Sequence, residues 1–507
     1  MPSYNSELFY QDWRYAVGKE FTTKDGQPFP YAANGHLHWG DELKKIEFGS
    51  AGSAEPRDAC VSGDGQSLAV ALQQDIHIID TNTWATVCIL RGHEEEVEGF
   101  AFAPNDSNIL VSTSQRDIGQ GDNHTEPVII VWDIKEYQKR HVAIQSQASL
   151  DEVVAEVAQT AASKIVEKGV RDNEDLRGKL ERAIKPGVTK VVASELAKDA
   201  ELIRGRIKTT AGSQVFSASG KKFVYVPGGR LRTNDVDVWD INIVSTSDFQ
   251  SDRIVLHGHT DLITWTGWNH DESLFASVSW DETIRVWDAN TGDQRFCFKT
   301  TRQNWTGRFS PDSKYFVATC GTGATHIYNM SDGSTVWVYE REGTRGWRRA
   351  LDWHPNSKWL AVGGEYLAPV YLLDVEKKEV LQQRTLSPEK THSQGSQDTE
   401  TVRSMLGGFL GVRQVRFIDN GNKLAVWTTG DDSLEVYDLA REVKWRFARG
   451  GTDDDIDNTK RRDGKGQLKA TYGSKMVIWE DKERRHPIFA SVDCDGIRIW
   501  SLALTGP

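Results

Sequence analysis

Residues 259–288 read HTDLITWTGWNHDESLFASVSWDETIRVWD, and this stretch decides the fold. It contains two runs in which apolar and polar residues alternate, 263–269 and 274–279, and the turn-forming residues 270–273 join them. A third run, 283–287, follows a tight turn. Short alternating runs separated by turn residues are typical of antiparallel β-strands. The stretch therefore predicts a small antiparallel sheet.

Two dipeptides bracket this sheet, Gly258-His259 at its start and Trp287-Asp288 at its end. The GH…WD bracket resembles a WD40 repeat, the four-stranded unit of a β-propeller. In that family a histidine, a serine or threonine, an aspartate and the tryptophan form a buried hydrogen-bonded relay. The resemblance assigns these positions to His259, Ser279, Asp281 and Trp287. Because buried polar groups must be paired, it implies a structural role for all four rather than a catalytic one.

The repeat recurs along the chain. The predicted second strands begin at Ser67, Asn108, Lys222, Ser273, Lys314, Lys358, Lys423 and Pro487. The predicted third strands end at Ile79-Asp80, Trp132-Asp133, Trp239-Asp240, Trp287-Asp288, Tyr328-Asn329, Leu373-Asp374, Tyr437-Asp438 and Trp500-Ser501. The sequence therefore predicts an all-β, WD40-like propeller of eight blades with a helical insertion. Only two of these blades carry both dipeptides, so seven blades with an additional β element is the alternative.

The last blade has too few residues after Trp500 for a full fourth strand, and an unpaired edge is a liability there. We expect residues 43–48 (LKKIEF) to supply that strand by pairing with residues 497–500. The predicted organisation follows from these assignments. It comprises an irregular N-terminal arm with the ring-closing strand (1–52), blades 1 and 2 (53–145), a helical insert (146–209) and blades 3 to 8 (210–507).

The insert has helical spacing of its apolar residues, and we expect a helix that ends near Gly169, a second over 174–184 and a third over 188–207, with a break at Pro186-Gly187. If residues 140–145 are the fourth strand of blade 2, the insert joins two blades. The insert is then interpreted as a cap on the ring or as a docking element for another protein. A membrane-surface helix is disfavoured because the polar side is not basic.

Two further long segments, 386–411 and 448–470, also follow predicted fourth strands, and we expect them to be mobile loops. In this interpretation all the insertions decorate one rim of the ring and leave the other nearly bare. The aspartates of 453–457 superficially resemble a calcium loop, but its required glycine and final glutamate are missing. No metal site is expected.

Composition limits the possible functions. The 507 residues carry a formal net charge of −12, which argues against a general nucleic-acid-binding surface. The five cysteines are scattered and form no CxxC pair, which suits a reducing compartment. We see no secretory signal and no apolar run long enough to span a membrane. The expected location is the cytoplasm, with the nucleus also possible.

We find no HExxH, GxSxG or phosphate-binding GxxxxGK[ST] motif, so the sequence predicts neither enzymatic activity nor a cofactor. It favours a non-catalytic scaffold that binds other proteins in a multiprotein assembly through its decorated face. The alternatives are an enzyme with a site in the central channel and a phospho-peptide or anionic-headgroup binder. Tryptophan and arginine are enriched at protein interfaces. The candidate partner-binding residues are Trp305, Arg345, Trp347, Arg348, Arg349 and Arg413.

Overall fold

The chain is a mainly-β, eight-bladed propeller with three inserted helices, which confirms the predicted fold and the larger blade number. The computed structural model describes residues 15–32, 42–48, 56–117, 125–141, 147–167, 174–198, 200–227, 239–340, 346–365, 367–388, 411–428, 434–447, 475–480, 486–493 and 496–502. The predicted loop 448–470 lies outside these residues, as does nearly all of 386–411. The chain divides into two compact units. Unit 1 comprises Met1–Gly52, Lys208–Ala218 and Ile254–Pro507, and unit 2 comprises Ser53–Ile207 and Ser219–Arg253.

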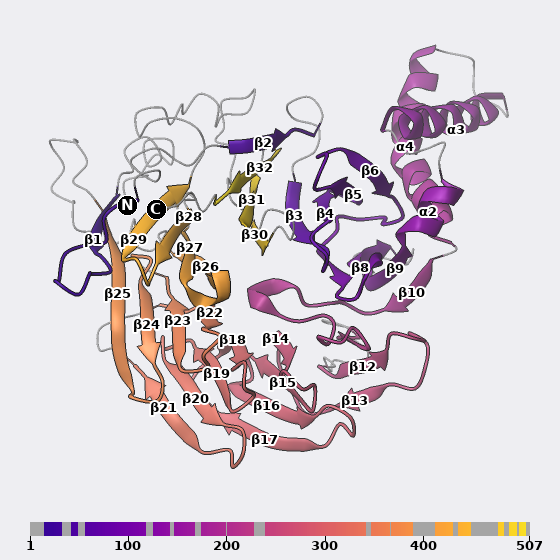
Figure 1. Cartoon of the computed structure of the whole chain (residues 1–507). Helices are drawn as coiled ribbons and strands as arrows, with labels where there is room; N and C mark the ends of the chain where they lie inside the picture. The colour runs from indigo at the N-terminus through magenta and orange to yellow at the C-terminus, as the bar shows by residue number, and fades with distance from the viewer. Residues whose placement is uncertain are drawn as a thin grey trace, which may run out of the picture. The chain divides into compact units, whose positions relative to one another are not determined.

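The described residues of unit 1 form five antiparallel sheets (Figure 1). Apart from two strands supplied by the N-terminal region, the strands of each sheet neighbour one another in chain order. The first two are β14 (Ile263–Trp268), β15 (Leu274–Ser279), β16 (Thr283–Asp288), β17 (Gln294–Lys299), and β18 (Asn304–Phe309), β19 (Tyr315–Cys320), β20 (Thr325–Asn329), β21 (Thr335–Tyr339). The next two are β22 (Ala350–Trp353), β23 (Trp359–Gly363), β24 (Val370–Asp374), β25 (Glu379–Pro388), and β26 (Val412–Ile418), β27 (Lys423–Thr428), β28 (Leu434–Asp438), β29 (Val443–Phe447). The fifth contains β30 (Lys475–Glu480), β31 (Pro487–Asp493) and β32 (Gly496–Ser501). Strand β13 (Ile254–Leu256) precedes β14, and short 3-10 turns lie at Thr210–Gly212 and Asp419–Gly421.

Apolar side chains fill the space between neighbouring blades. The first strands β14, β18, β22 and β26 lie side by side, and each pair of successive sheets shares one buried cluster. Phe316 of β19, for example, is fully buried against Trp265 of β14 and Phe309 of β18. Because each sheet buries both faces only with neighbours on either side, packing enforces the stacking of blades.

The predicted closing strand is present. Strand β2 (Glu42–Ile46) pairs antiparallel with β32, with Ile46 opposite Ile497 and Glu42 opposite Trp500. The final sheet therefore reads β2-β32-β31-β30, and its fourth strand comes from the N-terminal part of the chain.

The N-terminal arm is more regular than we expected. Strand β1 (Tyr15–Lys19) pairs with the outer strand β25 and makes that blade five-stranded. Beyond it, Phe21 and Phe29 are buried against Tyr437. The alternation that would have revealed β1 is only five residues long, too short to distinguish from an irregular segment.

Unit 2 contains two complete four-stranded sheets and part of a third. The complete sheets are β3 (Pro56–Val61), β4 (Ser67–Leu72), β5 (Asp75–Asp80), β6 (Thr86–Leu90), and β7 (Gly99–Ala103), β8 (Asp106–Asp117), β9 (Thr125–Asp133), β10 (Glu201–Arg204). Strands β11 (Lys222–Tyr225) and β12 (Ile241–Ser245) pair antiparallel. Trp239-Asp240 was expected to end this third strand but precedes it, because the buried apolar run begins only at Ile241.

The helical insert interrupts a blade, contrary to our expectation that it joins two blades. After β9 the chain enters α2 (Ile134–Arg140), whose first turn is capped by the Asp133 side chain. The fourth strand of this blade is β10, which pairs with β9 and follows the insert. Arg140, predicted to begin the fourth strand, instead ends α2, and residues 142–145 lie outside the described residues. The fourth strand of blade 2 is therefore β10 and not the predicted 140–145, so the blade extends to Arg204.

The insert itself contains α3 (Gln147–Glu167) and α4 (Glu174–Leu196), which pack side by side (Figure 1). The predicted break at Pro186 is wrong, because proline removes a single backbone hydrogen bond and α4 continues along α3. Directly after the helices, Ala197 packs in the same buried cluster as Trp132. Gly92 lies against these two residues, and a Cβ at position 92 would collide with the Ala197 methyl group and with the Trp132 ring.

The prediction that all the insertions lie on one rim of the ring is also wrong. In a four-stranded antiparallel blade, the connections between strands 1 and 2 and between strands 3 and 4 open at one end. The connection from strand 4 to the next blade opens at the other. The helical insert lies between β9 and β10, hence at the first end, whereas 389–410 and 448–474 follow the fourth strands β25 and β29.

Candidate functional site

The hydrogen-bonded relay that the family resemblance predicted is present at the sheet β14–β17, but its serine is not the one that we expected. His259 Nδ1 lies 2.8 Å from Asp281 Oδ2, and its Nε2 lies 2.7 Å from the Oγ of Ser277. The Trp287 indole donates to the same hydroxyl at 3.0 Å. A carboxylate only accepts, so His259 Nδ1–H donates to it and Nε2 accepts from Ser277. The relay serine is thus Ser277.

Ser279, which we expected in the relay, lies at the end of the strand and supports the next turn. Its hydroxyl donates to the Asp261 carbonyl at 3.0 Å and accepts from the Asp281 N–H at 3.1 Å. Burial alone would raise the pKa of the Asp281 carboxyl, but hydrogen bonds from His259, Thr283 and the Thr260 N–H hold that pKa well below its usual range. The two serines lie on the same strand face, so spacing alone could not separate them.

A second relay lies in unit 2 and ends differently. Trp132 donates to Ser112 at 2.7 Å, and Ser112 Oγ lies 2.6 Å from His93 Nε2. The second ring nitrogen of His93 contacts the hydroxyl of Ser114 at 2.6 Å, where His259 has a carboxylate. Burial lowers the pKa of His93 to about 3, so this imidazole is neutral. Both relays are fully occupied with structural hydrogen bonds.

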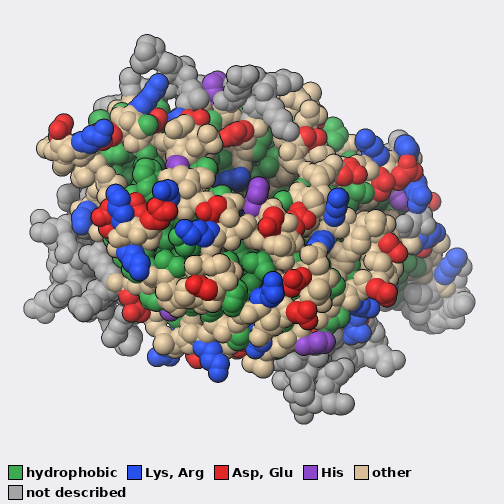
Figure 2. All heavy atoms as spheres, turned by 60° about the horizontal axis from the view of Figure 1, so that its bottom comes forward, with side chains coloured by type: hydrophobic (Ala, Val, Ile, Leu, Met, Phe, Trp, Pro, Cys, Tyr) green, Lys and Arg blue, Asp and Glu red, His purple; other side chains and the backbone are tan. Residues whose placement is uncertain are grey.

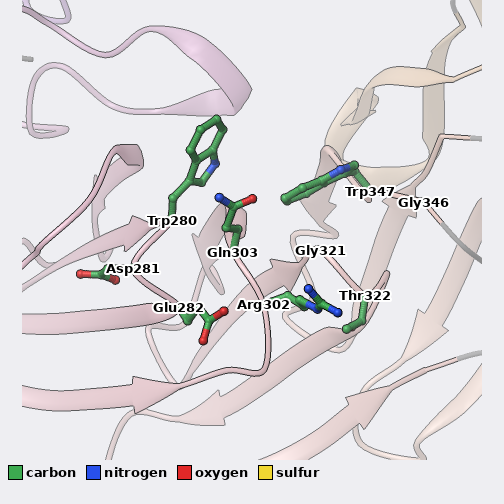
Figure 3. Close-up of a pocket in the computed structure, with 9 residues that line it drawn as sticks. All are labelled: Trp280, Asp281, Glu282, Arg302, Gln303, Gly321, Thr322, Gly346 and Trp347. Carbon is green, nitrogen blue, oxygen red and sulfur yellow. The ribbon is translucent and has the colours of Figure 1, made fainter.

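One hollow of unit 1 has a volume of about 970 Å³ (Figure 3). It opens among the turns between strands 2 and 3 and the connections between blades, in the sheets β14–β17, β18–β21 and β22–β25. Its lining consists of Trp280, Asp281, Glu282, Arg302, Gln303, Gly321, Thr322, Gly346 and Trp347, and we call it the tryptophan hollow. Figure 3 shows Trp280 and Trp347 on opposite sides of Gln303, and the Asp281 carboxylate directed away from the other labelled side chains. That carboxylate is the one that accepts from His259.

Three indoles from successive blades form a row at this hollow. The ring centroids of Trp280 and Trp305 lie 6.2 Å apart, and those of Trp305 and Trp347 lie 5.4 Å apart in an edge-to-face contact. A Cβ at Gly321 would lie 3.1 Å from the Trp347 ring and 3.3 Å from the Gln303 carbonyl oxygen. Glycine at this turn therefore lets the Trp347 ring lie close to the backbone.

Arg349 completes the row. Its guanidinium carbon lies 4.0 Å from the centroid of the Trp305 ring and 6.0 Å from that of Trp347. Its Nε forms an ion pair with Glu365 Oε1 at 2.8 Å. Trp305, Trp347 and Arg349, all predicted to bind a partner, are therefore brought together in space.

The remaining predicted arginines lie elsewhere. Arg348 is buried, donates to the Thr325 hydroxyl at 2.9 Å and to the Tyr339 carbonyl at 3.2 Å, and has no surface to offer a partner. Arg413 is exposed, with its guanidinium 5.7 Å from the Trp427 ring centroid. Arg345 lies outside the described residues. The four arginines thus do not assemble into one anion-binding cluster among the residues that the structure describes.

Sequence reasoning missed Trp280, Glu282 and Gln303. Each lies in a turn or a connection, where alternation carries no information. The available signal was the repeat register. It places the turn at 280–282 and the turn at 321–322 at equivalent positions of adjacent blades.

Charged side chains also meet on the first strands of unit 1. Arg308 of β18 pairs with Asp352 of β22 at 3.2 Å, and the Phe417 N–H donates to the same carboxyl group at 2.8 Å. Arg416 of β26 donates to the Ile478 carbonyl at 3.1 Å, and desolvation lowers its pKa. An arginine remains protonated regardless, so this cluster offers no general base.

One thiol, that of Cys320, belongs to the residue that precedes Gly321 of the lining. Burial would raise the pKa of Cys320, but hydrogen bonds with His326 and Thr322 lower it to about 7. Cys320 is nevertheless fully buried, with its Sγ 3.4 Å from the Arg302 carbonyl oxygen. A nucleophile must reach its substrate, so this geometry does not support a cysteine enzyme.

Blades, relays and repeat register together define a WD-repeat β-propeller. A family model described as WD domain, G-beta repeat matches residues 250–288. This match, the eight blades and the relays confirm the resemblance to the WD40-repeat family that the sequence predicted.

Several relatives share this family at low identity. Pre-mRNA-processing factor 19 of Oryza sativa subsp. japonica is 22% identical over 383 residues, which cover 70% of this chain and 68% of that protein. Lissencephaly-1 homolog of Caenorhabditis briggsae is 27% identical over 105 residues, which cover 20% of this chain and 26% of that protein. Transcription initiation factor TFIID subunit 5 of Caenorhabditis elegans is 22% identical over 145 residues, 26% of this chain and 22% of that protein. The last two matches thus span about a quarter of those relatives.

Among the described residues, no helix combines the length and the apolar character needed to cross a bilayer.

Proposed function

We propose that the protein is a non-catalytic platform that binds other proteins within a multiprotein assembly, and that the tryptophan hollow is its contact site. The observation that carries this proposal is the row of three indoles from successive blades, beside a hollow of about 970 Å³. Tryptophan contributes more binding energy at protein interfaces than almost any other residue. A row that three blades must assemble is suited to a folded partner or an extended peptide.

Two further observations support protein partners. A relative is named as a subunit of a transcription initiation factor, and subunits act by association. On the face that Figure 2 draws, acidic and basic side chains are interspersed, without the continuous basic surface that phosphate backbones require. The net charge of −12 agrees with this.

The two alternatives receive less support from the geometry. A channel enzyme needs an accessible acid, base or nucleophile, whereas His93, His259 and Cys320 are buried in structural contacts. An anion binder needs converging free guanidinium groups, whereas Arg348 is buried and Arg349 is already paired with Glu365. Cytoplasmic location, with the nucleus as the alternative, remains a prediction that fluorescent tagging would test.

Affinity purification from cells with quantitative mass spectrometry tests the platform. The double variant Trp280→Ala/Trp347→Ala should lose a defined set of partners by about tenfold, since two anchors are removed. Trp337→Ala is the matched control, because Trp337 is a half-buried tryptophan of the outer strand β21. Equal recovery of every partner by the double variant and the wild type, with both folded by circular dichroism, would refute the proposed site.

A further inference from the structure

The row of indoles already binds one cation, which belongs to the chain itself. The Arg349 guanidinium lies over the ring of Trp305, with the ring of Trp347 farther away, and pairs with the carboxylate of Glu365. Indole faces attract cations because their π-electrons are negative, and tryptophan does so more strongly than any other side chain. This arrangement is an internal example of arginine recognition.

The tryptophan hollow offers the kinds of group that surround Arg349, namely indole rings and a glutamate carboxylate. Trp280 and Trp347 stand on opposite sides, and the Gln303 amide lies between them (Figure 3). Glu282 also belongs to the lining, and its carboxylate corresponds to that of Glu365, which pairs with Arg349. Among the described residues Glu282 is in no ion pair within 4.0 Å, so its carboxylate is available.

The charges around the hollow favour a positive ligand. Besides Glu282 in the lining, the Glu340 carboxylate lies 3.4 Å from the hydroxyl of Thr322, which also belongs to the lining. Arg302 is the one basic residue of the lining, and in Figure 3 it lies at the Thr322 end, away from Trp280. Two carboxylates, those of Glu282 and Glu340, thus lie in or beside the lining, against the single guanidinium of Arg302.

We propose that the tryptophan hollow binds an arginine side chain from a basic segment of a partner protein, held between Trp280 and Trp347 and paired with Glu282. This inference rests on the proposed function and specifies the ligand of the same site. Arginine is favoured over lysine because its planar guanidinium stacks on indoles while its N–H groups donate to a carboxylate and to the Gln303 carbonyl.

Fluorine NMR of trifluoroacetyl-Gly-Gly-Arg-Gly-Gly-amide, titrated with the full chain, tests the proposal. The matched probes carry citrulline, lysine, leucine or glutamate in place of arginine. Citrulline has nearly the same shape as arginine but no charge, so we expect it to bind about tenfold more weakly. Lysine should bind more weakly than arginine, and glutamate should not bind.

Variants of the protein locate the binding. Glu282→Gln should weaken arginine binding several-fold, and Arg302→Gln should strengthen it by removing a like charge. Both residues are exposed or half-buried, so folding is retained even if Trp347→Ala unfolds the blade. Trp337→Ala should bind like the wild type.

The outcomes separate this inference from the proposed function. Equal binding of the arginine and citrulline probes, or preference for glutamate, would overturn the arginine assignment. If the Trp280→Ala/Trp347→Ala variant still loses its cellular partners, the platform stands and only the ligand is wrong. If partners are also retained, both proposals fail.

Discussion

The two relay histidines differ in the hydrogen-bond partner of their Nδ1 atom, and the relays have measurable effects on stability. His259 donates a hydrogen bond from Nδ1–H to the carboxylate of Asp281, whereas the corresponding nitrogen of His93 contacts the hydroxyl of Ser114. In both blades a single serine hydroxyl, Ser277 or Ser112, joins the tryptophan to the histidine. Removing that hydroxyl leaves the indole N–H and the imidazole nitrogen buried without their shared hydrogen-bond partner.

Ser277→Ala should therefore destabilise the protein by about 1–3 kcal/mol, because the Trp287 N–H and the His259 Nε2 lose their shared partner. Ser279→Ala is the matched control. It removes a hydroxyl of the same strand that supports a turn, and it should cost about 1 kcal/mol or less. Urea unfolding followed by tryptophan fluorescence measures both. A larger loss from Ser279→Ala would restore the assignment that the family resemblance suggested.

The burial of His93 makes stability depend on pH. Its pKa falls from 6.5 to about 3 on folding, so between these values the unfolded chain binds a proton that the folded chain does not. Stability then falls as the pH decreases from 6.5, by about 2 kcal/mol at pH 5 from this group. Urea midpoints between pH 7 and 5 should show this slope.

His93→Gln serves as the control for that slope. The variant should start less stable at pH 7 because the relay is damaged, yet lose less stability on acidification. An unchanged pH slope in His93→Gln would show that other groups, such as His77 with its pKa lowered to about 4 by burial, control the acid response.

At the scale of elements, an ion pair as well as the β1–β25 ladder attaches the N-terminal arm to the blades of unit 1. Lys444 of β29 contacts the Glu20 carboxylate, and both side chains are 7% exposed. A buried pair of this kind adds little relative to an apolar pair, but the loss of one partner leaves a buried charge.

Glu20→Gln alone should cost about 3–5 kcal/mol, since Lys444 then lacks its counter-charge. The double variant Glu20→Gln/Lys444→Met should recover most of that loss because no unpaired charge remains. A double-mutant cycle measured by urea unfolding checks this expectation. Strict additivity of the two changes would mean that the contact contributes no coupling.

The elements also show what sequence could and could not predict. Strands bounded by turn residues were located to within one or two positions, as at Ser67, Lys222, Lys423 and Pro487, because alternation follows directly from a half-buried sheet. The strand order around the insert was misjudged, because residues 140–145 and β10 offer equally short alternating runs. Only tertiary pairing with β9 decides between them.

The candidate site was predictable in part for the same reason. Trp305 and Trp347 adjoin strands, so their register placed them together. Arg348 and Arg349 are neighbours in sequence, but alternation directs one into the core and the other to the surface. Trp280 and Gln303 belong to turns whose geometry leaves no periodic trace in the sequence.

At the scale of the whole molecule, the last sheet depends on a strand supplied by the N-terminal region. The variant Lys44→Pro/Lys45→Pro should lower the melting temperature and promote aggregation, because one of two consecutive N–H groups must face β32 and proline has none. Lys44→Ala/Lys45→Ala removes the same side chains, including the exposed Lys45–Glu47 pair, and should be nearly neutral.

Differential scanning calorimetry with size-exclusion chromatography compares the two variants. If the proline variant melts and elutes like the alanine variant, β2 is dispensable for the sheet.

The pairing of β2 with β32 also sets an order of events during synthesis. The ribosome releases β2 early and β32 among the last strands, so the early strand waits without its partner while every other blade is made. Until β32 emerges, the nascent chain offers the hydrogen-bonding edge of this sheet to any other extended polypeptide. A message truncated before the codon for Gly496 would yield a product that is a target for chaperones and proteases, although it encodes almost all of the blades.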